Sequence, residues 1–220
     1  MLNFSDLLPY TDVFFSGLMT TIELTLLTTV LGVVLGTTCA AVRQYGHPAS
    51  QRAVAAYVEL IRNTPFIVQL FFIFFGLPSI GLMLSPWQAS VIALTINLGA
   101  YSTEIIRAGL NNIPKGQWEA AKVLGMDFRQ TLTRVVFTPA FEKIYPALTS
   151  QCIIVMLGSA VLSQISVQDL TYAANLVQSR NFRAFESYVV TALMYLGLAM
   201  LMRYVFAMIG KRVFAFREAQ

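Results

Sequence analysis

Residues 115–143 read KGQWEAAKVLGMDFRQTLTRVVFTPAFEK and form a polar interruption between two apolar stretches. The segment carries Glu119-Ala120-Ala121 and, after three further residues, Gly125. Because Pro114 cannot continue a helix interior and glycine takes a positive φ without strain, we expect a short helix over 117–124 that ends in a bend at Gly125. A polar segment with so regular a pattern, in an otherwise apolar chain, indicates a surface on which another molecule docks. The alternative is a solvated amphipathic connector.

The second half of this segment predicts another short helix. Asp127 is suited to cap it, and Leu132 and Val136 lie on the side expected to face the membrane, together with Val135. Pro139 is expected to end this second helix, because proline lacks the backbone N–H that the helix interior requires.

The composition indicates that lipid surrounds most of the chain. Of its 220 residues, 56% are hydrophobic and 12% are charged, against about 25% charged residues in an average soluble domain. The net charge is +4, but the basic residues form no patch with stacking aromatics, so nucleic acid is not an expected partner. The single histidine, His47, lies in a polar turn, which argues against a histidine-based metal site.

Five stretches are long and apolar enough to cross a bilayer, which takes about 20 residues per helix. The expected spans are 14–42, 58–78, 87–109, 144–166 and 187–210, and the polar segment falls in a loop over 110–143. We therefore expect an all-α integral membrane protein with one transmembrane domain over residues 1–220.

The basic residues choose an orientation for these spans. The loops on one side of the five spans carry 13 Lys and Arg residues, whereas the other side carries 2. Cytoplasmic loops are enriched in these residues, so the loop over 110–143 and the C-terminus are expected in the cytoplasm and the N-terminus outside. The N-terminus has no basic n-region, so no cleaved signal peptide is expected.

Several blocks of this sequence resemble the membrane subunits of ABC importers, and more narrowly the polar amino acid permeases. They are GQWEAAKVLGM at 116–126, ELIRNTPFIVQLFF at 59–72 and AYSTEIIRAGLNNIPKGQ at 100–117. The resemblance covers roughly residues 15–212, and it implies the type I ABC importer permease fold in a bacterial inner membrane.

The resemblance also implies partners. They are a second permease subunit, either a copy or a related chain, two ATP-binding cassette ATPase subunits and an extracytoplasmic amino acid-binding protein. In this family the polar loop is a coupling helix seated in a groove of the ATPase, and Glu119, Ala120, Ala121 and Gly125 would make that contact here. The chain has no GxxxxGK[ST] sequence, so ATP-Mg is expected on the ATPase, with no cofactor and no enzymatic activity on this chain.

Two positions depart from the family pattern. The family usually has proline at the position of Thr138, but here Pro139 follows one residue later. Many relatives carry Lys, then Asp or Asn, before the outer end of the fourth span, where this chain has the uncharged Leu157-Gly158-Ser159-Ala160. Gly158, Ser159 and Ala160 are expected to allow close helix packing.

Polar groups within the spans are candidates for function, because a charge in the hydrocarbon region costs about 2.5–3.5 kcal/mol on insertion scales. Asn97, Tyr101 and Glu104 are spaced i, i+4 and i+7 and share one helical face. This face is a candidate lining of the translocation pathway, with Ser159 as a further candidate. The alternative is that Glu104 makes a structural pair with Arg107, three residues on.

Arg62-Asn63-Thr64-Pro65, at the start of the second span, is a candidate structural or gating element. All four residues match the family, and Pro65 is expected to bend the helix. The loop over 169–186, expected outside, either contacts the binding protein or is solvated.

Other functions fit the sequence less well. An ABC importer permease for another small solute, such as an amino acid derivative or an opine, has the same features. A self-sufficient channel or secondary transporter would leave the ordered polar loop unexplained. A membrane-embedded enzyme would need a cluster of His, Asp and Glu or a serine nucleophile motif, and the sequence suggests neither.

Overall fold

The computed structural model describes residues 2–214, apart from the side chain of Thr138, and within these residues the regular structure is helical with no strand. The expected all-α class is thereby confirmed. The main helices are α1 (Thr11–Tyr45), α2 (Pro48–Arg62), α3 (Phe66–Phe71), α4 (Pro86–Asn111), α5 (Lys115–Val123), α6 (Phe128–Gln130), α7 (Phe137–Gly158), α8 (Leu170–Asn181) and α9 (Ala184–Val213).

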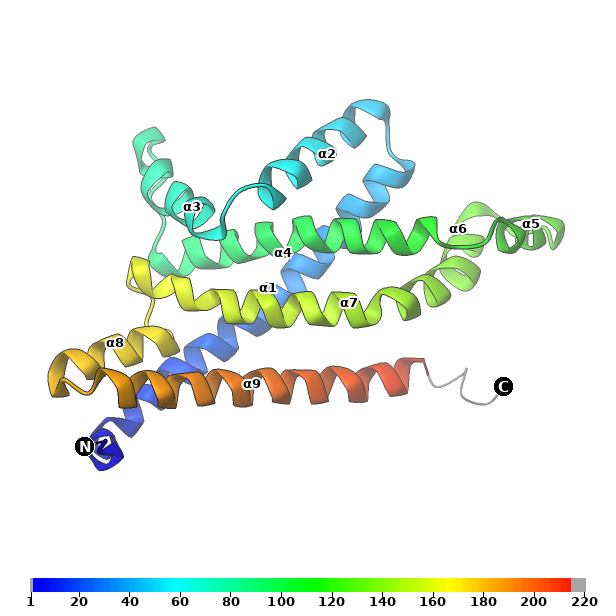
Figure 1. Cartoon of the computed structure of the whole chain (residues 1–220). Helices are drawn as coiled ribbons and strands as arrows, with labels where there is room; N and C mark the ends of the chain where they lie inside the picture. Colours follow the sequence, from blue (N-terminus) through cyan, green and yellow to red (C-terminus); the bar gives the residue numbers. More distant parts are fainter. Residues whose placement is uncertain (1, 215–220) are drawn as a thin grey trace.

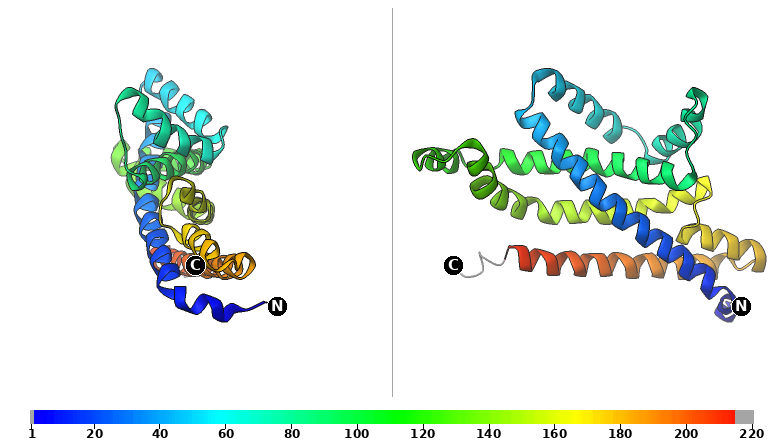
Figure 2. Two further views of the ribbon diagram at one scale, coloured as in Figure 1. Left: turned by 90° about the vertical axis from the view of Figure 1, so that its left-hand side faces the viewer. Right: turned by 180° about the vertical axis from the view of Figure 1, so that it is seen from behind.

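Three long helices, α4, α7 and α9, lie side by side, and α1 crosses them obliquely (Figures 1 and 2). Four segments are long and apolar enough to cross a membrane, namely Phe4–Tyr45, Pro86–Asn111, Pro139–Ile165 and Ala184–Val213. The bent pair of α2 and the segment Phe66–Ile80 gives a fifth crossing if it is one span. The N-terminal helical turns and α5 lie at opposite ends of the bundle (Figure 1).

Small residues bring α1 and α4 together. A Cβ placed on Gly36 of α1 would lie 2.4 Å from the Cβ of Ser102 on α4, and one placed on Gly99 would lie 2.7 Å from a methyl group of Leu35. Lipid tails are as apolar as the helix surfaces, so the hydrophobic effect does not drive helices together within a bilayer. Helices in lipid therefore associate largely through such close packing. The contact fixes α4, which carries most of the candidate pathway residues.

The second span begins earlier and bends more sharply than the helix expected over 58–78 with a bend at Pro65. Its helical structure already begins at Pro48, and the axes of α2 and of Phe66–Ile80 differ by 111° across a break at residues 63–65. Pro65 has no N–H and disfavours the helical conformation of the residue before it, so the helix ends here. The bend expected at Pro65 is therefore present, and it is much sharper than a kink.

The expected helix end at Pro139 is wrong. The helix that begins at Phe128 passes through a π-helical turn, Thr131–Val136, directly into α7. Pro139 is the third residue of α7, follows the π turn closely and has no N–H to donate. The wider π turn shifts the hydrogen-bond register ahead of the proline and so lets the helix continue.

Candidate functional site

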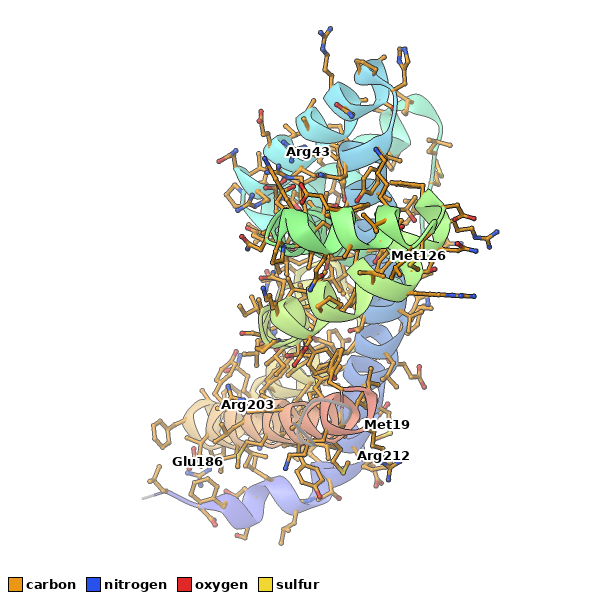
Figure 3. All side chains as sticks on the ribbon, turned by 90° about the vertical axis from the view of Figure 1, so that its right-hand side faces the viewer. Met19, Arg43, Met126, Glu186, Arg203 and Arg212 are labelled. Atoms are coloured by element: carbon orange, nitrogen blue, oxygen red, sulfur yellow. The ribbon has the colours of Figure 1, made fainter. Side chains whose placement is uncertain are left out.

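An ion-pair network joins α1, α2 and α4 at the end of the bundle that carries α5. The Glu104 carboxylate lies 3.2 Å from Nη2 of Arg107 and 3.8 Å from Nη1 of Arg62, and it also pairs with Arg43. Figure 3 looks onto this end of the molecule and labels Arg43. Three guanidinium groups around one carboxylate leave a formal charge of +2.

Of the two interpretations of Glu104, the structure supports a structural ion pair rather than a residue of the pathway lining. The expected pair with Arg107 is present, and Glu104 is not among the residues that line the pocket described below. The participation of Arg43 and Arg62 was missed, because spacing along one helix says nothing about contacts between helices.

Gln69 supports the break between α2 and α3. The side chain is 8% exposed, and its Nε2 donates to the carbonyl oxygens of Ile61 (2.7 Å) and Thr64 (3.0 Å) and to Thr64 Oγ1 (2.9 Å). A broken helix leaves carbonyls without their usual N–H partners, and at membrane depth water does not replace them. Gln69 Oε1 in turn accepts from Asn97 Nδ2 at 3.0 Å, so the bend is tied to α4.

A pocket of about 410 Å³ lies where this bend meets α4 and α7. It contains the candidates Thr64, Pro65, Asn97 and Tyr101, which the fold brings together from two distant stretches of sequence. Its full lining is Thr64, Pro65, Phe66, Leu94, Asn97, Tyr101, Gln151, Ile154, Val155 and Gly158. The Arg62 guanidinium lies over the Tyr101 ring, 5.5 Å from its centroid, and so connects the pocket to the ion-pair network.

The α7 side of the pocket corrects two expectations. Ser159 does not line it: the residue is fully buried, and its hydroxyl donates to the Met156 carbonyl at 2.7 Å. Gly158 lines the pocket instead, and a Cβ there would meet nothing within 4 Å, so Gly158 is not a packing position. The sequence analysis missed Gln151. Gln151, Ile154, Val155 and Gly158 are spaced i, i+3, i+4 and i+7 and so share one face of α7, on which Gln151 is the one polar residue that lines the pocket.

The polar segment over 115–143 folds much as its residues predict. The expected short helix is α5, Gly125 takes φ +71°, and Asp127 caps the next turn, with its Oδ1 accepting from the Gln130 N–H at 2.7 Å. Met126, labelled in Figure 3, lies in the turn between α5 and α6.

The docking candidates divide into exposed and buried residues. Glu119, Ala120 and Gly125 are exposed. Ala121 is 2% exposed, on the side of α5 that packs back toward the protein, so the expectation that it touches a partner is corrected. Val123 and Leu124, by contrast, are 87% and 78% exposed.

An aromatic stack connects the polar segment to the end of α1. The Phe128 ring stacks on Trp118 of α5 with centroids 6.2 Å apart, and it meets Tyr45 of α1 edge-on at 5.1 Å. Aromatic pairs in these geometries contribute about 0.5–1.5 kcal/mol beyond their buried area. The Phe128 ring therefore links α5 to the end of α1 through side-chain contacts.

At the opposite end, residues 169–186 are mostly helix rather than loop. Asp169 caps α8, its Oδ1 accepting from the Tyr172 N–H at 2.8 Å and its Oδ2 from the Tyr195 hydroxyl at 3.3 Å. Burial raises the pKa of Asp169 to about 6. Arg183 pairs with Asp6 at 2.9 Å, which holds the N-terminal turn against the α8–α9 junction.

The chain is similar to known proteins over most of its length. Residues 32–215 match the family model described as "Binding-protein-dependent transport system inner membrane component". The L-cystine transport system permease protein TcyB of Bacillus subtilis (strain 168) is 35% identical over 198 residues, which are 90% of this chain and 85% of TcyB. The arginine transport system permease protein ArtQ of the same organism is 30% identical over 213 residues, 96% of this chain and 95% of ArtQ.

Solved structures share the fold. A chain from the "Crystal structure of an amino acid ABC transporter with histidines" has a TM-score of 0.89 and 35% sequence identity, covering 96% of this chain and 99% of that chain. A chain of the MetNI methionine ABC transporter in an inward-facing conformation has a TM-score of 0.79 at 21% identity, over 94% of this chain and 98% of that chain. This second likeness concerns the fold alone.

Proposed function

Because the chain belongs to the family of binding-protein-dependent transport system inner membrane components, we propose that it is the permease subunit of an ATP-driven importer of polar amino acids. The observation that carries this function is the pocket of about 410 Å³ between the helix break, α4 and α7. Its volume falls within the range of about 300–1,000 Å³ that is usual for small-molecule sites. Its lining mixes apolar side chains with amides and hydroxyls, which suits a small polar solute.

The exposed face of α5 is the proposed contact with the ATPase. Glu119 and Ala120 lie there, together with the apolar side chains of Val123 and Leu124. Large apolar side chains exposed at the end of a helix, beside charged residues, are typical of a protein contact. Gly125 contributes the turn that ends this surface, and Ala121 supports it from the inner side.

The remaining partners follow from the proposed function. A second permease subunit, two ATPase subunits that bind ATP-Mg and an extracytoplasmic amino acid-binding protein would complete the importer. We propose that the α5 end lies in the cytoplasm and the N-terminus outside, because the distribution of Lys and Arg favours that orientation.

The coupling mechanism uses contacts present in the chain. ATP binding would close the ATPase dimer and move α5, and the stack of Trp118, Phe128 and Tyr45 would pass that movement to α1. Since α1 packs tightly on α4, the two helices would rock together and open the pocket to alternate sides of the membrane.

The docking surface is tested by Glu119→Lys, which reverses one exposed charge on α5. We expect this variant to insert in the membrane normally and to lose co-purification with the ATPase subunit. Asp12→Lys is the matched control, because it reverses an exposed carboxylate at the opposite end of the bundle and should co-purify at wild-type yield. Wild-type yield of the complex with Glu119→Lys would refute the docking role.

A further inference from the structure

The proposed substrate pocket has an uncharged lining and lies next to the positively charged ion-pair network. The charge of a solute's side chain should therefore affect how well it binds. Building on the proposed function, we propose that this pocket rejects amino acids with cationic side chains and accepts those with neutral polar side chains. The relatives named above carry cystine and arginine, so membership of the family leaves the charge of the side chain open.

The lining supplies no counter-charge for a cation. Its polar members are Thr64, Asn97, Tyr101 and Gln151, and none of the ten lining residues carries a carboxylate. A guanidinium or ammonium group that leaves water for such a pocket loses its hydration without gaining an ion pair. A neutral amide or ureido group loses far less on the same transfer.

The charged groups beside the pocket have the wrong sign for a cation. Arg62 stacks on the Tyr101 ring that forms part of the wall. Behind it, Glu104 is shared among Arg62, Arg43 and Arg107, so the cluster is positive overall. The α-ammonium and α-carboxylate are common to all amino acids, so in the low dielectric of a membrane-embedded site this excess positive charge disfavours those with an additional cation on the side chain.

The polar groups of the wall suit a neutral side chain that both donates and accepts hydrogen bonds. Asn97 donates one N–H of its side-chain amide to Gln69 Oε1, and this hydrogen bond fixes the orientation of the amide. The amide oxygen and the other N–H remain able to bind a solute. Gln151 offers a second amide from α7 across the pocket. Two amides that face one solute recognise a carboxamide or ureido group in the same way as they recognise each other.

The test compares citrulline with arginine, which have nearly the same shape and differ in side-chain charge. The probe is equilibrium binding of each radiolabelled amino acid to the permease–ATPase complex in detergent, without the binding protein. We expect citrulline to bind at least about ten-fold more tightly than arginine. Gln151→Glu adds a carboxylate to the wall and should reduce this preference at least about ten-fold or invert it.

Two further variants keep the result interpretable. Gln164→Glu makes the same substitution at an exposed position outside the pocket and should leave the preference unchanged. Gly158→Asp adds a carboxylate where a Cβ meets nothing within 4 Å, so it replaces Gln151→Glu if that variant does not fold.

Each outcome has a distinct meaning. Equal or tighter binding of arginine by the wild type, or an unchanged preference in the folded acidic variant, would overturn the inference while leaving the importer function intact. If the complex shows no ATP-dependent uptake of any amino acid, the proposed function itself fails.

Discussion

The substitution Gln69→Met tests how the broken second span is held. Gln69 is nearly buried and donates to the carbonyl oxygens of Ile61 and Thr64, which the break leaves without helical partners. Its Oε1 accepts the bond from Asn97 that ties the bend to α4. Methionine has a similar length and makes none of these bonds, so the substitution removes the polar contacts and retains the volume.

The expected cost follows from counting these bonds. Hydrogen bonds between helices within membranes average about 0.6 kcal/mol and reach about 1.7 kcal/mol in double-mutant cycles. A buried group left without its partner costs about 1–3 kcal/mol. Loss of the two carbonyl bonds and the Asn97 bond should therefore lower the free energy of unfolding by about 2–4 kcal/mol.

The assay is denaturant unfolding of the purified chain in mild detergent, followed by circular dichroism. Gln164→Met is the matched control: Gln164 is exposed, and its replacement should change the free energy of unfolding by less than about 0.5 kcal/mol. If Gln69→Met unfolds at the same denaturant concentration as the wild type, Gln69 does not hold the bend, and the reasoning about the orphaned carbonyls is wrong.

Three other predictions follow from contacts at different places in the fold. Gly36→Leu should destabilise the α1–α4 pair by about 1–3 kcal/mol, because its Cβ would lie 2.4 Å from the Cβ of Ser102, whereas Gly197→Leu meets nothing within 4 Å and should be tolerated in the same unfolding assay. Phe128→Ala should leave assembly with the ATPase intact and lower the amino acid imported per ATP hydrolysed, since the link from α5 to α1 is lost; an unchanged ratio would contradict this role. The pKa of Asp169 is about 6 in the folded state and about 3.9 in the unfolded state, so the folded state holds the proton more tightly. The free energy of unfolding should therefore fall by up to about 3 kcal/mol as the pH rises from 4 through 6. Asp169→Asn should remove this pH dependence, and an unchanged pH dependence would exclude Asp169 as its source.

The sequence predicts the helical class and the polar segment well, because both depend on local patterns. Hydropathy locates the apolar stretches, and Asp127 and Gly125 act on neighbouring residues, so their roles as cap and bend are readable one position at a time. The position of the break can likewise be predicted from Pro65 alone. The angle of 111° cannot be predicted in this way, because the path of the chain after the break depends on what α3 packs against.

The errors concern contacts between elements. Ala121 and Ser159 belong to faces that turned out to be buried, and the sequence does not say which side of a short helix meets the rest of the chain. Arg43 and Arg62 reach Glu104 across helix boundaries. Pro139 was expected to end a helix because proline lacks a backbone N–H, and the π turn that lets the helix continue leaves no mark in the hydrophobic pattern.

Gln69 and Gln151 could have been found from the sequence. Each is an amide in a long uncharged stretch, where a polar side chain needs a partner or a function. A search for lone amides in the spans would have added both to the candidate site, one as the support of the helix break and the other as part of the pocket wall.

The most direct test of the central claim is uptake of radiolabelled amino acid into proteoliposomes, measured for this chain alone and for this chain with its partner ATPase and binding protein. We predict uptake only when the partners and ATP-Mg are all present, and loss of that uptake with Glu119→Lys. Uptake by the chain alone, without ATP, would contradict the account and identify a self-sufficient transporter or channel.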